Sequence, residues 1–253
     1  MLNMFNLEGK IAMVTGGNTG IGNAIAMGLA KAGADLFIFS YNDDNMSEMT
    51  KEVEALGRKI SFATGDLSKE EIAMRAAEIC VEKMGRIDIL VNNAGTIKRS
   101  PILEGSNEDW NTVINLNLSS IYYLSKVAAG FMVKQGSGKI INIASMLSFQ
   151  GGKFVPSYTA SKHGVAGLTK AFANELACEN VQINAIAPGY IETANTAPIR
   201  ADQKRNEEIL SRIPAARWGQ TEDLVGGAIF LSSSASNYVN GHILAIDGGW
   251  QVR

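Results

Sequence analysis

The chain has little of what disulfide-rich domains and nucleic-acid-binding proteins contain. Its 253 residues include only two cysteines, Cys80 and Cys178, which are too few and too far apart for a disulfide framework or a zinc site. We expect each of them to be a small buried residue, as free cysteines usually are. The 23 basic and 25 acidic residues leave a formal charge of −2. This balance gives no basic field for binding nucleic acid or an anionic membrane.

Long apolar runs and targeting segments are also lacking. The longest uncharged stretch, Ile11 to Ala30, contains glycines interleaved with threonine and asparagine, unlike a helix that spans a lipid bilayer. The opening residues, MLNMFNLEGK, contain no basic region followed by an apolar segment and a small-residue cleavage site. These features favour a cytoplasmic protein with a single domain over residues 1–253, because one α/β core can extend to about 250 residues.

Short apolar runs alternate with longer segments of helical spacing along the chain. Runs such as IDILV and KIINI are apolar on both faces of a strand, which is typical of a parallel sheet covered by helices on both sides. The pattern predicts an α/β fold, a Rossmann-like doubly wound parallel sheet of about seven strands in a three-layer α/β/α sandwich. The expected strands are Ile11–Val14, Leu36–Phe39, Ile60–Ala63, Ile87–Val91, Lys139–Ile143, Gln182–Ile186 and Ile243–Ile246.

Some helices can also be placed. Ser68 and Ser106 are each followed by an acid three residues later, which predicts a helix start capped by the serine. Segments 108–134 and 157–178 have helical spacing with apolar residues on more than one face, which indicates deep burial or a subunit interface. The least regular stretch, 190–214, includes a short charged helix near 201–210 and is expected to form a substrate loop.

A glycine-rich turn follows the first expected strand. Gly16, Gly20 and Gly22 lie in the segment TGGNTGIG, which leads directly into a helical segment. Glycines at such a turn let the backbone approach a pyrophosphate, and the N-terminus of the following helix offers N–H groups and a positive dipole end. The turn therefore predicts a dinucleotide site, although its spacing differs from the general G-x-G-x-x-G pattern.

The spacing T-G-x-x-x-G-I-G resembles that of the short-chain dehydrogenase/reductase family, and the chain carries further motifs of that family. Asp66-Leu67 follows the third expected strand, an NNAG motif the fourth, and Pro188-Gly189 the sixth. The resemblance covers essentially the whole chain and implies an enzyme that transfers hydride between NAD(P) and a CH–OH group. The cofactor-binding residues that it implies are Gly16, Asn18, Thr19, Gly20, Ile21, Gly22, Ser40, Tyr41, Asp66, Leu67, Asn93, Ala94, Gly95, Tyr158, Lys162, Pro188, Gly189, Ile191 and Thr193.

The catalytic tetrad of that family is matched by Asn117, Ser145, Tyr158 and Lys162. Tyr158 and Lys162 are four residues apart on an expected helix and so share one face. A phenol, with a reference pKa of about 10, needs a nearby cation to act as an acid or base at neutral pH, and Lys162 would supply it. Ser145 can hydrogen-bond the substrate oxygen where charge develops, and in the family Asn117 holds a water that links Lys162 to solvent. No metal site is expected.

The residues after the second expected strand bear on the choice of cofactor. An acid there normally binds the ribose hydroxyls of NAD, but this chain has Ser40, followed by Tyr41 and Asn42. Neither these positions nor the glycine turn contain an Arg or Lys for the 2′-phosphate of NADP, which Asp43 and Asp44 would repel. The sequence therefore favours NAD(H), while NADP(H) is not excluded.

Within the family, segments such as KIINIASMLSFQGG, APGYIETANT and SSASNYVNGHILAIDGGW resemble those of dehydrogenases that act on short sugar acids in uronate breakdown. That resemblance implies reversible reduction of the C5 ketone of 2,5-didehydro-3-deoxy-D-gluconate to 2-dehydro-3-deoxy-D-gluconate. The carboxylate of such an acid needs a cation, and Arg99 offers a planar bidentate fork. The expected substrate-binding residues are Ser145, Arg99, Lys98, Met146, Gln150, Tyr158 and Asn195.

Other functions stay open at this point. A gluconate 5-dehydrogenase shares these motifs and acts at the same hydroxyl position of a similar acid. The activity of a 3-oxoacyl carrier-protein reductase fits the sequence less well, because the basic surface patch and the NADPH determinant expected of such an enzyme are not found. A nucleotide-binding sensor without the reaction would be expected to lack Tyr158 or Lys162, and both are present. The family's homotetramer would pair the two long helices and the segment from Gly241 to Trp250 between subunits.

Overall fold

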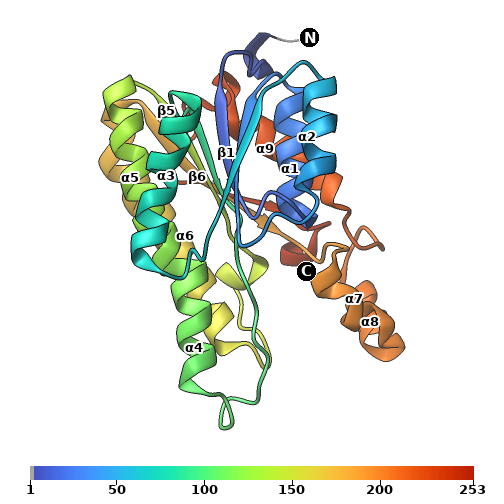
Figure 1. Cartoon of the computed structure of the whole chain (residues 1–253). Coiled ribbons are helices and arrows are strands. Elements are labelled where there is room, and N and C mark those ends of the chain that lie inside the picture. The colour runs from blue at the N-terminus through green and yellow to red at the C-terminus, as the bar shows by residue number, and fades with distance from the viewer. Residues whose placement is uncertain (1–2) are drawn as a thin grey trace.

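The computed structural model describes residues 3–253 and contains a seven-stranded, fully parallel sheet (Figure 1). The strands lie in the order β3-β2-β1-β4-β5-β6-β7, and the predicted α/β class and doubly wound sheet are confirmed. Each expected strand is present, with ends that differ by no more than two residues. The strands are β1 (Ile11–Thr15), β2 (Asp35–Ser40), β3 (Ile60–Thr64), β4 (Ile89–Asn92), β5 (Gly138–Ile143), β6 (Val181–Pro188) and β7 (Ile243–Ile246).

Helices cover both faces of the sheet, which explains why its central strands are apolar on both sides. One face packs against α1 (Gly20–Lys31), α2 (Met46–Ala55) and α9 (Val225–Ser232). The other packs against α3 (Glu70–Met84), α5 (Ser120–Gln135) and α6 (Pro156–Leu176). All residues of β1, β4, β5 and β6 are buried between these layers.

The strand order reverses between β1 and β4, where an open parallel sheet binds ligands beyond the carboxyl ends of its strands. Further helices extend past that end of the sheet in Figure 1. They are α4 (Asn107–Ile114), which follows the loop after β4, and α7 (Ala197–Ala201) and α8 (Gln203–Arg212), which follow β6. The segment expected to form a substrate loop thus contains two short helices, α7 and α8, in place of one.

The long helix expected over 108–134 is interrupted. Residues Asn115–Ser119 form a π-helical turn between α4 and α5. A π turn has one extra residue per turn, so the backbone hydrogen bonds shift and a carbonyl group is freed from the α-helical pattern. The turn contains Asn117, one of the four expected catalytic residues.

Of the two predicted serine helix caps, one is present and one is not. Ser106 caps α4, because its side chain accepts the N–H of Asp109 at 3.0 Å. The predicted cap by Ser68 is wrong: α3 begins one residue later than that pattern requires, and the N–H of Ser68 itself donates to the Asp66 carboxylate at 3.0 Å.

The two cysteines also differ. Cys80 is fully buried on α3, as expected, whereas Cys178 is exposed. The prediction for Cys178 is wrong because it lies in the 3-10 turn Ala177–Glu179, after the buried part of α6 has ended. Among residues 3–253, no helix has the length and apolar character needed to cross a membrane.

Candidate active site

The glycine turn has a shape that side chains would block. Gly16 and Gly20 have φ angles of +60° and +54°, in the left-handed region that favours glycine. A Cβ on Gly22 would collide with the carbonyl oxygen of Gly16 and with Nδ2 of Asn93. The turn is therefore a cradle of bare backbone. Thr19 precedes α1 without capping it, so the first N–H groups of that helix are left for a pyrophosphate.

The loop after β4 is bound directly to this turn. The N–H groups of Asn93 and Ala94 both donate to Oγ1 of Thr15 at 3.0 Å. In return, Nδ2 of Asn93 donates to the carbonyl oxygens of Thr15 and Gly16, at 2.9 and 3.1 Å. Two of the expected cofactor segments are thus brought together across the reversal in strand order.

The end of β2 presents an unpartnered hydroxyl. Ser40 is 3% exposed, and its Oγ has no hydrogen-bond partner within the described chain. Beside it, Nδ2 of Asn18 donates to Oδ1 of Asn42 at 3.2 Å and to the carbonyl oxygen of Asp44 at 3.1 Å. Tyr41 is 79% exposed. This arrangement of hydroxyl and amide groups suits the ribose of a dinucleotide.

The other expected cofactor residues lie at the same end of the sheet. Asp66 and Leu67 follow β3, and Gly95 lies in the loop after β4. A Cβ on Gly20 would be 4.0 Å from the methyl group of Thr193, so the segment after β6 contacts the glycine turn. The remaining members of this group are Ile21 on α1, Pro188 and Gly189 at the end of β6, and the buried Ile191.

Lys162 lies near Tyr158 on α6. Its Nζ is 5.5 Å from the centroid of the Tyr158 ring and donates to the carbonyl oxygen of Ile143 at 2.6 Å. Lys162 is only 4% exposed, and burial lowers its pKa to about 8. The ammonium group is therefore a buried cation that gives up its proton more readily than an ordinary lysine.

The hydroxyl of Ser145 lies beside that of Tyr158. Burial raises the pKa of Tyr158, while the neighbouring Ser145 hydroxyl and the positive charge of Arg99 act in the opposite direction. Oγ of Ser145 accepts the N–H of Leu147 at 3.1 Å, so its own proton is available for donation to Tyr158 or to a substrate oxygen. The site thus holds a phenol beside a hydroxyl donor and two cations.

Asn117 is completely buried in the π turn. Its amide binds both backbone groups of Thr96 and approaches Oγ of Ser161 at 3.4 Å. Because Ser161 lies on α6, between Tyr158 and Lys162, Asn117 connects the loop after β4 with the helix that carries the other tetrad residues. Three elements therefore meet where the sequence places the tetrad.

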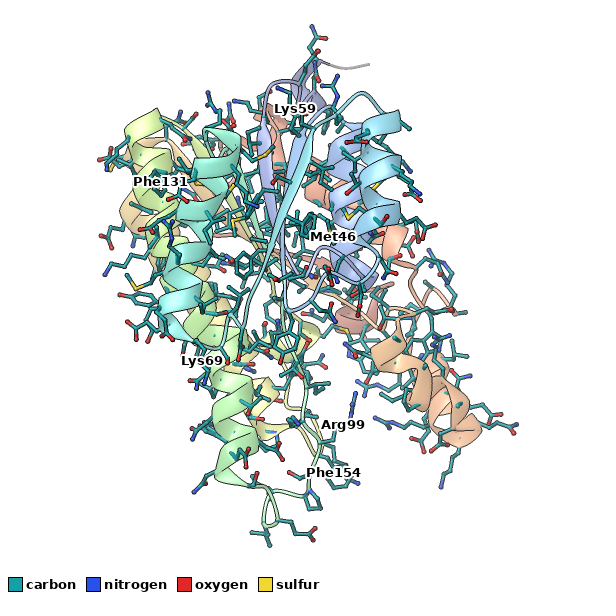
Figure 2. All side chains as sticks on the ribbon, in the orientation of Figure 1. Met46, Lys59, Lys69, Arg99, Phe131 and Phe154 are labelled. Atoms are coloured by element: carbon teal, nitrogen blue, oxygen red, sulfur yellow. The ribbon has the colours of Figure 1, made fainter. Side chains whose placement is uncertain are left out.

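The two basic residues expected to bind a substrate carboxylate differ in their surroundings. Nζ of Lys98 lies 3.5 Å from the carboxylate of Asp109. Arg99 is exposed and makes no ion pair with residues 3–253, yet its charge acts on Tyr158. Figure 2 shows its side chain projecting from the loop after β4 on the side that faces α8.

Three other expected substrate contacts lie around this region. Met146 is buried in an apolar cluster with Ile209 and Ile213 from the segment of α8. Gln150 is half-buried and binds Trp250. Asn195 is exposed in the short turn Ala194–Thr196.

Sequence reasoning missed an aromatic cluster that includes Trp250, the partner of Gln150. The ring centroid of Tyr190 lies 5.3 Å from that of Trp218 and 4.8 Å from that of Trp250, in edge-to-face arrangements. The guanidinium of Arg212 lies 3.9 Å from the Trp250 ring centroid. These residues come from distant parts of the chain and share no spacing that a sequence pattern could detect. Among residues 3–253, no three His, Cys, Asp or Glu side chains gather in a way that could hold a metal ion.

A dinucleotide cradle beside a Ser-Tyr-Lys group is the site of a cofactor-dependent oxidoreductase. The model of the short chain dehydrogenase family matches residues 10–204, and the chain belongs to that family. It is 58% identical over 250 residues to a 2-dehydro-3-deoxy-D-gluconate 5-dehydrogenase of Bacillus subtilis. The aligned residues make up 98% of this chain and 97% of that protein. A protein of the same name from Escherichia coli is 53% identical over the full length of both chains.

A solved structure supports the same placement. A candidate NAD(P)-dependent gluconate 5-dehydrogenase from Beutenbergia cavernae superimposes with a TM-score of 0.95 at 47% sequence identity. The match covers 99% of this chain and 100% of that one, and that structure contains NADP at low occupancy. The protein is therefore an NAD(P)-dependent oxidoreductase by family.

Proposed function

We propose that the protein interconverts 2,5-didehydro-3-deoxy-D-gluconate and 2-dehydro-3-deoxy-D-gluconate in the breakdown of uronates from pectin, alginate or glycosaminoglycans. The observation that carries this proposal is the charge of Arg99 beside the Ser145–Tyr158 pair, in a chain 58% identical to a relative of that name. The hydroxyl groups of Ser145 and Tyr158 fit a ketone that must receive a proton. The guanidinium of Arg99 fits the carboxylate of the same small molecule.

The residues of the chain handle the proton. When NAD(H) is bound, its nicotinamide ring supplies or accepts the hydride at C5 of the sugar acid. In reduction, Tyr158 donates its phenolic proton to the oxygen that becomes the C5 hydroxyl, and Ser145 donates a hydrogen bond to that oxygen. In oxidation, the phenolate of Tyr158 takes the hydroxyl proton back. General acid–base transfer of this kind typically contributes about 10²- to 10⁴-fold in rate.

Lys162 and Asn117 support this proton transfer. The buried ammonium of Lys162 stabilises the phenolate of Tyr158, which burial alone would disfavour. Since Nζ of Lys162 already donates to the Ile143 carbonyl, its position is fixed while two further N–H groups stay available. The π turn at Asn117 frees backbone carbonyl capacity beside α6, the helix that carries Lys162, which supports a bound water as the path from Lys162 to solvent.

Arg99 is our choice for the substrate carboxylate. The ammonium of Lys98 is engaged by Asp109 at 3.5 Å, whereas no carboxylate among residues 3–253 pairs with the guanidinium of Arg99. An arginine can also bind a carboxylate through two parallel hydrogen bonds. Met146, Gln150 and Asn195 complete the expected contacts to the sugar acid.

We favour NAD(H) over NADP(H) as the cofactor. The end of β2 presents the hydroxyl of Ser40 and the amides of Asn18 and Asn42, which suit ribose hydroxyls. A carboxylate oxygen of Asp44 accepts from Nδ2 of Asn42 at 2.6 Å, so negative charge lies beside the amide groups that we expect to bind the ribose. Charge repulsion there would disfavour NADP.

Two surfaces of the protein are suited to contacts with further copies of the chain. An open surface hollow lies between α5 and α6, lined by residues that include Tyr122, Gly164 and Leu168, and Tyr122 is 40% exposed. Strand β7 ends the sheet, and one of its edges has no paired strand among residues 3–253; such edges are usually covered. We propose that these two surfaces bury against further copies in a homotetramer, and that the enzyme is cytoplasmic.

Absorbance at 340 nm tests the proposal. Purified protein is assayed with NAD or NADP and with equal concentrations of 2-dehydro-3-deoxy-D-gluconate or D-gluconate. The proposal predicts the higher kcat/KM for the deoxy keto acid with NAD. Preference for gluconate would support the other activity suggested by a similar structure, and a higher kcat/KM with NADP would overturn the cofactor assignment.

A further inference from the structure

A hydrogen bond links the last turn of the chain to the loop beside Ser145. The indole Nε1 of Trp250 donates to Oε1 of Gln150 at 3.0 Å, across 100 residues of sequence. An indole N–H can only donate, so the amide oxygen of Gln150 must be the atom that faces it. The amide Nε2 of Gln150 is consequently directed away from Trp250, and it has no hydrogen-bond partner among residues 3–253.

The backbone around Gln150 does little to fix this amide. Gln150 lies in the loop that leads from Ser145 to α6, and its N–H donates to the carbonyl oxygen of Met146 at 3.2 Å. Gly151 follows it, and the N–H of Gly152 donates to Oγ1 of Thr159 at 3.2 Å. These bonds hold the backbone of the loop, but neither of them involves the side-chain amide of Gln150. The bond from Trp250 therefore decides where the Gln150 side chain lies and which of its polar atoms is presented.

Trp250 is itself held firmly. It is 5% exposed and packs in one cluster with Met146, which follows Ser145, and with Ile209 and Ile213. The Arg212 guanidinium lies against one face of its ring, at a distance where a cation–π contact is favourable. Arg253, at the chain end, donates to the carbonyl oxygen of Ser211 at 2.6 Å. The indole is thus a rigid anchor between the Ser145 loop and α8.

We propose that Trp250 is a positioning residue for sugar-acid recognition, which fixes the Gln150 amide so that Nε2 donates a hydrogen bond to an oxygen of the substrate. The inference rests on the proposed function, because a sugar acid offers hydroxyl, carbonyl and carboxylate oxygens as acceptors. Trp250 does not touch the substrate in this arrangement. It determines that Gln150 presents a donor and not an acceptor.

The chain provides a matched control in Trp218. It is also 5% exposed, contacts the same Tyr190 ring, and donates its indole N–H to an amide oxygen, that of Asn206, at 2.7 Å. Replacing either tryptophan by phenylalanine removes one indole N–H and similar volume from one cluster. Only Trp250→Phe releases Gln150. A general packing defect should therefore affect both variants alike.

The test measures KM for the sugar acid, KM for NAD, kcat and the unfolding midpoint for both variants. We expect Trp250→Phe to raise KM for the sugar acid about 5- to 10-fold, the effect of one hydrogen bond, with KM for NAD and kcat changed less than about twofold. Trp218→Phe should lower the unfolding midpoint similarly but leave KM for the sugar acid within about twofold. Equal KM increases in both variants would overturn the proposal.

A double-mutant cycle separates action through Gln150 from action by another route. In a Gln150→Leu background, where no amide is left to position, Trp250→Phe should add less than about twofold to KM, since the effects of coupled residues do not add. If the double variant instead shows the product of the two single effects on KM, the proposal is overturned. If the wild-type enzyme turns over D-gluconate in place of the deoxy acid, the cycle is run with gluconate. Absence of turnover with both acids would instead refute the proposed function, and this inference with it.

Discussion

The side chain of Asn117 binds both backbone groups of Thr96: its Oδ1 accepts the Thr96 N–H and its Nδ2 donates to the Thr96 carbonyl oxygen, each at 2.8 Å. This two-point contact joins the π turn between α4 and α5 to the loop after β4. The same loop continues to Lys98 and Arg99. Asn117 therefore has a structural role in placing the loop in addition to the catalytic role that family resemblance implies.

Replacing Asn117 by alanine should be destabilising because it leaves the N–H and the C=O of the part-buried Thr96 without their partners. Each such group costs about 1–3 kcal/mol, so we expect Asn117→Ala to lower the free energy of unfolding by about 2–4 kcal/mol. Urea denaturation of the two proteins measures this difference. A loss below about 0.5 kcal/mol would show that Thr96 finds other partners and that the contact does not hold the loop.

Gly22→Ala should weaken cofactor binding while leaving the fold intact. The added methyl group would meet the Gly16 carbonyl and the Asn93 side chain, and this pushes apart the two loops that form the cradle. We expect at least about a tenfold increase in the dissociation constant of NADH, equivalent to about 1.4 kcal/mol, measured by NADH fluorescence. Gly130→Ala, on α5 with open space around the new methyl group, is the control and should bind NADH normally.

The different surroundings of Arg99 and Lys98 predict different effects of their removal. Arg99→Ala should raise KM for the sugar acid about 10- to 100-fold, as expected for loss of a charge-assisted hydrogen-bond pair. Lys98→Ala removes an ammonium that Asp109 already engages and should raise KM far less. Steady-state kinetics on the two variants decide between them, and a larger effect from Lys98→Ala would move the carboxylate site to Lys98.

A buried lysine far from the site makes stability depend on pH. Burial, helped by the charge of Lys10, lowers the pKa of Lys139 to about 8, whereas an unfolded lysine titrates near 10.4. Between these values the unfolded chain binds more protons, so this group makes the folded state more stable as pH rises. The stability of Lys139→Met relative to wild type should therefore decrease from pH 7 to pH 9.5 in urea unfolding. A difference independent of pH would contradict the assigned pKa.

The sheet and the glycine turn could be predicted because their signals are local. Strands such as β5 are apolar on both faces, and the turn carries its glycines at fixed positions. The structure shows why Gly16 and Gly22 are needed there, since one has a positive φ and the other touches backbone. Tyr158 and Lys162 lie on one helix and Ser145 follows β5, as their spacing predicts, while the catalytic roles of these residues stay a prediction.

Features that depend on distant contacts could not be predicted. The segment 108–134 has uninterrupted helical spacing, which does not predict the π turn in its middle. The feature that accompanies this turn is the hydrogen bond from Asn117 to Thr96, in a loop that lies earlier in the chain. The bond between Trp250 and Gln150 spans 100 residues. The exposure of Cys178 depends on where α6 leaves the core, which residue composition does not reveal.

In the proposed mechanism, Tyr158 transfers the proton during oxidation and reduction of a sugar acid. The most direct test is the rate of NADH formation from NAD and 2-dehydro-3-deoxy-D-gluconate by wild type and by Tyr158→Phe, with NADH binding measured in both. Wild type should turn over the acid, and the variant should bind NADH normally but react at least about 100-fold more slowly, the effect of losing a general acid–base group. A wild-type enzyme without activity, or a variant that retains most of the rate, would contradict this role of Tyr158.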